Sequence, residues 1–441
     1  MSEKLSRPAP VSFREAFWYW LKLGFISFGG PTGQIAIMHT DLVERKRWIS
    51  ERRFLHALNY CMLLPGPEAT QLAVYIGWLM HRTWGGVIAG ALFVLPSLVL
   101  LIGLTWVYLV FGDVPTVAGF LYGIKPAITA IVLFAAWRIG SRALKSAWLW
   151  AIAVAAFIAI FVFDLPFPLI IICAALFGFI GGRLKPDAFT IGGHAGTHKD
   201  YGPSLIGDGE QLPHTHYSAG KLACCVGVGL LLWSAPIALL FALPGVEVLR
   251  DMGWFFTKAA MLTFGGAYAV LPYVFDSAVE HYRWLSAPQM IDGLALGETT
   301  PGPLIMIVAF VGFVGAWTHE VFGPNVALAG IAGACIATYF TFLPSFIFIL
   351  AGGPLVEATH GDLRFTAPLT GITAAVVGVI VNLAAFFAYH VFWPRGFAAP
   401  FEWFAALLAL AAFLALLRYK AGMIPVILLS GLAGLIFHLA I

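Results

Sequence analysis

The chain contains Leu64-Pro65-Gly66-Pro67-Glu68-Ala69-Thr70-Gln71 and a related stretch, Glu298-Thr299-Thr300-Pro301-Gly302-Pro303, whose Pro-Gly-Pro motif lies 236 residues further on. An earlier motif, Phe28-Gly29-Gly30-Pro31, recurs at the same spacing as Phe264-Gly265-Gly266 followed by Ala267. At this offset, 12 of the 40 positions from 28 to 67 are identical without a gap. Self-similarity that preserves glycine, proline, tryptophan and charge predicts an internal duplication.

The composition identifies the solvent of both halves as lipid. Hydrophobic residues make up 60% of the chain, charged residues 11%, and the mean hydropathy is +0.89. A soluble protein carries roughly a quarter charged residues. The apolar residues form long runs near the ~20 residues that span a bilayer, at 83–112, 146–163, 222–246, 321–356, 365–394 and 421–441. We therefore predict an all-α polytopic membrane protein with about nine full crossings plus a helical hairpin in each half, and no nucleic-acid partner.

The charges of the two halves predict opposite orientations. Arg45, Lys46, Arg47, Arg52 and Arg53 follow the first Phe-Gly-Gly motif, whereas the second copy keeps only Arg283. Lys and Arg favour the cytoplasmic side, so the first loop is expected inside and its copy outside. Inversion requires an odd number of crossings between the halves. The expected division is a first repeat at 1–182, a polar cytoplasmic linker at 183–221, an orientation-inverting helix at 222–247 and a second repeat at 248–441.

The repeated breaks are the predicted substrate site, because inverted-repeat transporters bind substrates where their helices are interrupted. Pro-Gly-Pro ends one half-helix, and its second proline suits the start of another. Unpaired N–H groups at a helix start favour an anion. The alternative is a tight hairpin turn without binding. The candidate substrate-binding residues at the breaks are Gly29, Gly30, Gly66, Thr70, Gln71, Gly265, Gly266, Thr299, Thr300 and Gly302.

Ionisable residues within apolar sequence are costly in lipid and indicate function. Lys22 and Lys258 precede their Phe-Gly-Gly motifs by a few residues and are candidates to attract an anion. Alternatively, their side chains extend to the membrane interface. Glu68 and Glu298 are candidate proton carriers, since burial raises a carboxyl pKa. The alternative is a structural, hydrogen-bonded carboxyl group.

In these motifs the chain resembles the two-domain chromate ion transporters, and the resemblance covers the whole chain. It implies a secondary transporter that exports chromate from the bacterial cytoplasm through the inner membrane and confers chromate resistance, with sulfate as a similar competitor. Ala267 replaces the proline of the first motif, so the two halves need not bind substrate equivalently. The alternatives are a transporter of another small anion, such as sulfate, and a structural membrane subunit without transport.

An intramembrane enzyme would need a nucleophile–base pair or metal ligands at helical spacing, and the sequence contains no HExxH, GxSxG or paired aspartates. We predict neither enzymatic activity nor a cofactor. His194, His198, His214 and His216 make a metal site in the linker conceivable, but a solvated loop explains its composition better. A homodimer is compatible with the sequence.

Overall fold

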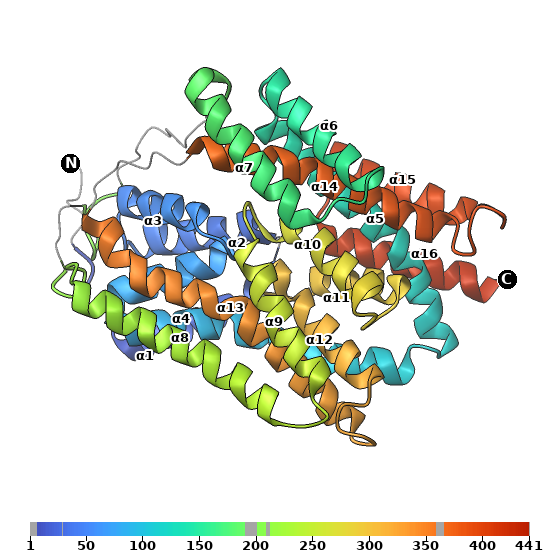
Figure 1. The fold of residues 1–441 in the computed structure, drawn as a ribbon, viewed down its shortest axis with the longest axis horizontal. Coiled ribbons are helices and arrows are strands. Elements are labelled where there is room, and N and C mark those ends of the chain that lie inside the picture. Colours follow the sequence, from blue (N-terminus) through green and yellow to red (C-terminus); the bar gives the residue numbers. More distant parts are fainter. Residues whose placement is uncertain (1–6, 29, 190–200, 209–211, 359–365, 441) are drawn as a thin grey trace.

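A computed structural model describes residues 7–28, 30–189, 201–208, 212–358 and 366–440. These residues form 16 α-helices (Figure 1) and an isolated β-bridge. The first repeat consists of α1 (Phe13–Ile26), α2 (Gly30–His39), α3 (Glu51–Leu63), α4 (Glu68–Phe111), α5 (Pro115–Ala143), α6 (Ala147–Phe161) and α7 (Phe167–Leu184), with short turns η1 (Thr40–Arg45) and η2 (Pro186–Ala188).

The second repeat repeats this order after an extra helix, α8 (Ala219–Ala242). It consists of α9 (Glu247–Met261), α10 (Ala267–Asp276), η3 (Ser277–His281), α11 (Ala287–Thr299), η4 (Leu304–Met306), α12 (Ile307–Thr318), α13 (Val326–Ala358), α14 (Thr366–Phe392), α15 (Trp403–Arg418) and α16 (Met423–Ala440). The predicted fold class is confirmed: an all-α protein of two homologous repeats with interrupted helices.

Backbone conformation repeats at the same offset as the sequence. The left-handed φ values of Gly30, Arg47 and Gly66 recur 236 positions later at Gly266, Arg283 and Gly302. A left-handed φ is uncommon outside glycine, so three such pairs at one spacing show that the two repeats share the same backbone conformation at these positions.

Helix α4 corresponds to two consecutive helices of the second repeat. Its backbone breaks at His81 and at Arg82, where φ is +56°. The part before the break matches η4 and α12, and the long part after it matches α13. Gly77 and Gly85 allow the two parts to pack back to back, because a Cβ at Gly77 would lie 2.5 Å from the Gly85 carbonyl oxygen.

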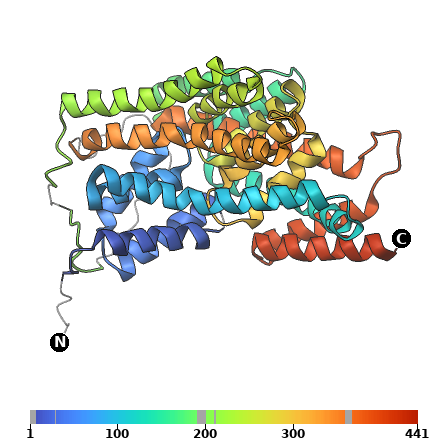
Figure 2. The same cartoon turned by 90° about the horizontal axis from the view of Figure 1, so that it is seen from below.

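Among the described residues, seven helices are long and apolar enough to cross a membrane: α4, α5, α7, α8, α13, α14 and α16. Three shorter apolar segments are Ala147–Phe161, Leu304–Thr318 and Trp403–Arg418. Figure 2 shows the long helices lying roughly parallel, as the spans of a membrane bundle do. The chain is therefore a multi-pass membrane protein.

The two repeats exchange their last two helices. Helices α6 and α7 of the first repeat pack on α14 of the second, and α15 and α16 of the second pack on α5 of the first. Helices α5 and α14, on which the exchanged pairs pack, also contact each other (Figure 1). The exchange makes the repeats one interlocked body.

The described part of the linker is docked on the first repeat and is not a fully solvated loop. Ile206 forms a parallel β-bridge with Ile49, and the Ile206 side chain is buried. Arg53 donates to the Gly207 carbonyl at 3.1 Å, and His214 lies 3.0 Å from the Trp78 carbonyl. The sequence analysis predicted a solvated loop because a polar composition does not reveal backbone pairing. His194 and His198 lie outside the described residues.

Candidate functional site at the crossing of the helix breaks

The two Pro-Gly-Pro motifs lie where the repeats meet. The Gly66 amide donates to the Thr263 carbonyl oxygen at 2.7 Å, and the Gly302 amide donates to the Ser27 carbonyl oxygen at 2.8 Å. Ser27 and Thr263 each precede a Phe-Gly-Gly motif and are themselves 236 positions apart. Each repeat thus binds its Pro-Gly-Pro break to the Phe-Gly-Gly break of the other. We call the Gly66–Thr263 contact the first junction and the Gly302–Ser27 contact the second junction.

Both junctions require glycine. The φ angles of Gly66 and Gly302 are +125° and +113°, a region that side chains rarely adopt. A Cβ at Gly66 would overlap the Ser345 hydroxyl, and a Cβ at Gly302 would lie 2.6 Å from the Ser97 Cβ. Ser97 and Ser345 end the Leu-Pro-Ser motifs inside α4 and α13. Each junction is therefore closed by a long helix of the opposite repeat.

Two glutamine side chains support the junctions. The Gln71 amide nitrogen donates to the Pro65 carbonyl at 2.8 Å and to the Ser345 hydroxyl at 3.3 Å. The Gln34 amide nitrogen donates to the Gly302 carbonyl at 2.5 Å. Both side chains are buried, and Gln34 was not predicted because its burial depends on which face of α2 meets a neighbour.

Several buried polar atoms around the junctions have no hydrogen-bond partner in the described part of the chain. They are the Ser27 hydroxyl, the Thr70 hydroxyl, the Gln71 carbonyl oxygen and the Ser97 hydroxyl. An unsatisfied buried polar group costs about 1–3 kcal/mol. Three of the four are hydroxyls, which donate well to an oxyanion. The junctions thus contain donors that a polar ligand or water would satisfy.

Helix starts at the breaks also favour an anion. Helix α4 begins after Pro67, and α10 begins after Gly266, both without a side-chain cap. Gly30 and Gly266 have left-handed φ values of +72° and +99°, and a Cβ at either would meet no atom within 4 Å. A ligand can therefore approach this backbone closely. Gly265 faces Thr373 at 3.6 Å from its would-be Cβ, and Gly29 lies outside the described residues.

The two threonines of the second break are satisfied within their own helix. Thr299 donates to the Ala295 carbonyl at 3.0 Å, and Thr300 donates to the Gly297 carbonyl at 3.1 Å. Their hydroxyl oxygens keep lone pairs, but their protons would have to turn to reach a substrate. Their role in substrate binding stays a prediction.

The two candidate proton carriers have different surroundings. Glu298 is buried and accepts a hydrogen bond from the Tyr268 hydroxyl. Glu68, the first residue of α4, is half-buried and has no partner among the described residues. Its counterpart 236 positions later is Leu304. The carboxyl groups therefore do not form a symmetric pair.

Arg138 is a site residue that sequence reasoning missed. It lies five residues before the end of α5, is half-buried, and is close enough to Glu298 and Tyr268 to act on both electrostatically. Its guanidinium group makes no hydrogen bond or ion pair within the described ranges. Sequence reasoning did not single it out, because it lies near two other basic residues, Arg142 and Lys145, at the end of an apolar run. A guanidinium with free donors near the breaks is suited to an oxyanion.

Lys22 and Lys258 are not brought together with the junctions. Both are exposed on the outer faces of α1 and α9. Each follows a tryptophan by four positions, Trp18 at 58% and Trp254 at 49% exposure. This exposure is what the interfacial alternative expects. Their role in attracting the anion stays a prediction.

Two ion pairs tie the repeats together. Arg53 in α3 lies 2.6 Å from Glu357 in α13, and Tyr75 also donates to Glu357 at 2.6 Å. Lys125 in α5 lies 3.4 Å from Asp292 in α11, which also accepts from Tyr108 at 3.0 Å. A cavity of about 350 Å³ opens beside this second pair. In the described residues, no cluster of three or more His, Cys, Asp or Glu is arranged to hold a metal ion.

Comparison with known proteins gives a consistent result. A sequence-family model described as "Chromate transporter" matches residues 14–179 and 250–435. The chromate transport protein of Pseudomonas aeruginosa is 33% identical, over 97% of this chain and 93% of that protein. The chromate transport protein of Cupriavidus metallidurans is 28% identical, over 97% and 94%. The probable chromate transport protein of Synechococcus elongatus is 26% identical, over 84% and 83%. No solved structure matches the chain.

Proposed function

This chain belongs to the chromate transporter family, and from that premise we propose that it exports the chromate dianion from the cytoplasm of a bacterial cell through the inner membrane. That it is a membrane transporter follows from the family and from its apolar helices. The direction, the cargo, the membrane and the resulting chromate resistance are the proposal.

The observation that carries the proposal is the pair of junctions. Each joins a helix start of one repeat to the break of the other, and buried hydroxyls at Ser27, Thr70 and Ser97 have no partner in the described structure. Helix N-termini and hydroxyl donors stabilise a tetrahedral dianion without metal ligation. Arg138 supplies a positive charge close enough to Glu298 to act on it electrostatically.

The membrane potential favours this direction. A cell interior that is negative by about 100 mV expels a dianion with roughly 4.6 kcal/mol, twice the value for one charge.

Glu68 and Glu298 are the proposed proton carriers if transport is coupled to protons. In that case Glu298→Gln removes the effect of a pH gradient on the uptake rate, while Glu320→Gln, at an exposed position after α12, leaves it unchanged.

Sulfate is the proposed competitor. Its charge and tetrahedral shape resemble those of chromate, and hydrogen-bond donors at helix starts discriminate poorly between two such dianions.

We also propose a homodimer. Helix α8 offers an apolar outer face, since only 11% of its most apolar window is buried, and a doubled mass after mild solubilisation would support this part.

The test is uptake of labelled chromate into everted membrane vesicles, with and without a pH gradient. Chromate uptake that excess sulfate inhibits is the expected result. Correctly inserted protein that takes up neither anion would overturn the proposed cargo. Uptake of sulfate alone would reassign the transporter to sulfate.

A further inference from the structure

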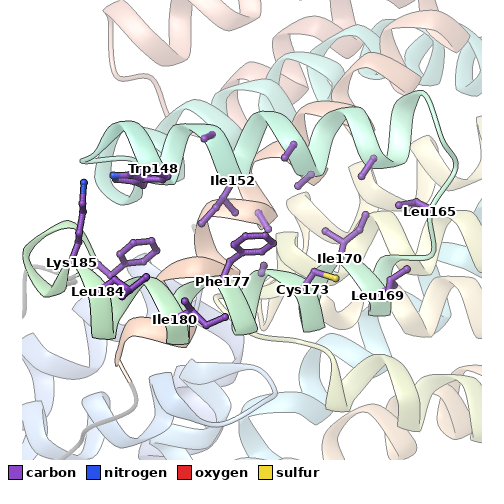
Figure 3. Close-up of a pocket in the computed structure, with 18 residues that line it drawn as sticks. Trp148, Ile152, Leu165, Leu169, Ile170, Cys173, Phe177, Ile180, Leu184 and Lys185 are labelled. Carbon is purple, nitrogen blue, oxygen red and sulfur yellow. The ribbon is translucent and has the colours of Figure 1, made fainter.

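A long apolar groove separates α6 from α7 on the outside of the bundle (Figure 3). Its volume is about 580 Å³, and Ala375 of α14 contributes to its floor. One wall is a stripe of small residues on α6, at Ala151, Ala155 and Ala159, and the other is formed by larger side chains of α7. From Leu169 to Leu184 the groove follows α7 for roughly 22 Å at 1.5 Å per residue. This length exceeds one leaflet, about half of the ~30 Å hydrocarbon core of a bilayer.

The other repeat contains the same pair of helices, with aromatic rings packed between them at one end. Helices α15 and α16 correspond to α6 and α7 at an offset of 256 positions. Between them Phe404 and Phe437 stack with their ring centroids 3.9 Å apart, and Tyr122 of α5 stacks 6.1 Å from each. In the first repeat the position of Phe404 is occupied by Trp148 and that of Phe437 by Gly181, and a Cβ at Gly181 would overlap the ring of Phe189. At this end both repeats are thus packed with aromatic rings, and the groove runs along α6 and α7 beyond Trp148 and Phe189.

One end of the groove is basic. Lys185 lines it, with the ammonium group 5.1 Å from the Trp148 ring centroid (Figure 3). Lys145 and Arg183 lie next to this end and are exposed. The Ser146 hydroxyl, which donates to the Ala188 carbonyl at 3.1 Å, fixes the start of α6 beside these residues. Basic residues concentrate on the cytoplasmic side, where anionic lipids make the membrane surface negative.

We propose that this groove binds an anionic phospholipid, with an acyl chain between α6 and α7 and the headgroup phosphate at Lys185. An apolar groove alone gives little preference, because a lipid tail is equally apolar in the surrounding bilayer. Selectivity must therefore come from the charges at the Lys185 end. A bound chain would also cover α14 from the outside where Ala375 contributes to the floor of the groove.

The test is native mass spectrometry of the purified full-length protein, titrated with phosphatidylglycerol or phosphatidylethanolamine of identical acyl chains. The wild-type protein is expected to bind phosphatidylglycerol at least fivefold more tightly. Ala155→Phe, which fills the groove from an exposed wall position, should remove this preference. The matched control is Ala411→Phe, at the equivalent position of α15, and it should retain the preference.

A second variant keeps the proposal testable if Ala155→Phe does not fold. The double substitution Lys145→Gln and Lys185→Gln changes two exposed side chains and should equalise the two lipids. Equal binding of both lipids by the wild type would overturn the proposal. The proposal would also be overturned if the wild-type protein were a dimer and the Ala155→Phe variant a monomer, because the groove would then bind a second copy of the chain.

Discussion

At the scale of single residues, the account depends on the two junction glycines. Gly66 and Gly302 have left-handed φ values, and their amides bind across the repeat boundary. Alanine at either position adds backbone strain of about 1–3 kcal/mol, besides the overlap with Ser345 or Ser97. We predict that Gly66→Ala and Gly302→Ala each lower the melting temperature of the purified protein by several degrees.

The control for this prediction is Gly103→Ala. Gly103 lies in α4 with an ordinary φ, and a Cβ there meets no atom within 4 Å. Alanine is up to about 1 kcal/mol more favourable than glycine in a helix, so the control should melt at the same or a higher temperature. Equal melting of all three variants would contradict the requirement for glycine at the junctions.

Arg138 gives a second prediction at this scale. Hydrogen bonds that involve a charged group contribute about 1.5–3 kcal/mol, so Arg138→Gln should reduce chromate uptake into everted vesicles by about tenfold or more. Arg142→Gln is the matched control, because Arg142 is exposed in the last turn of the same helix. A similar uptake rate in both variants would remove Arg138 from the substrate route.

At the scale of elements, the docked linker has a pH-sensitive contact. Burial lowers the pKa of His214, and the positive charges of Arg82 and Arg53 lower it further, while the hydrogen bond to the Trp78 carbonyl opposes the shift. The unfolded or undocked linker therefore binds a proton more readily than the docked one. The contribution of His214 to docking is present above its ordinary pKa of about 6.5 and decreases as the pH falls below that value.

We accordingly predict faster hydrogen exchange in residues 201–208 and 212–216 at pH 5.5 than at pH 7.5, after correction for intrinsic exchange. His214→Gln should remove most of this difference, and the exposed His216→Gln should keep it. An identical pH response in all three proteins would show that His214 does not control the docking.

Whether an element could be predicted from sequence depended on whether its signal is local. The helix breaks were predictable, because glycine and proline act on their own backbone. The duplication was predictable because these residues recur at a fixed spacing. The burial of a side chain was not, because it depends on which face of a helix meets a neighbour. For this reason Lys22 and Lys258 were expected at the site and lie on exposed faces, while Arg138 and Gln34 were missed.

At the scale of the whole molecule, the contacts between repeats were the hardest part to predict. The sequence around Gly66 and Thr263 does not indicate that the Gly66 amide donates to the Thr263 carbonyl oxygen. The two residues are distant in sequence and meet only in the folded chain. The exchange of α6 and α7 with α15 and α16 is likewise a property of the assembled bundle. The division of the chain at 182, 221 and 247 stays a prediction, although α8 lies between the two sets of corresponding helices.

The central claim is that two homologous repeats cross the membrane in opposite directions and meet at the junctions. It is tested most directly by single cysteines at Arg45 and His281, two exposed positions 236 residues apart, in a protein whose five native cysteines are replaced. A membrane-impermeant maleimide should label His281→Cys in intact spheroplasts and Arg45→Cys only after lysis. Labelling of both cysteines from the same side would contradict the inverted arrangement.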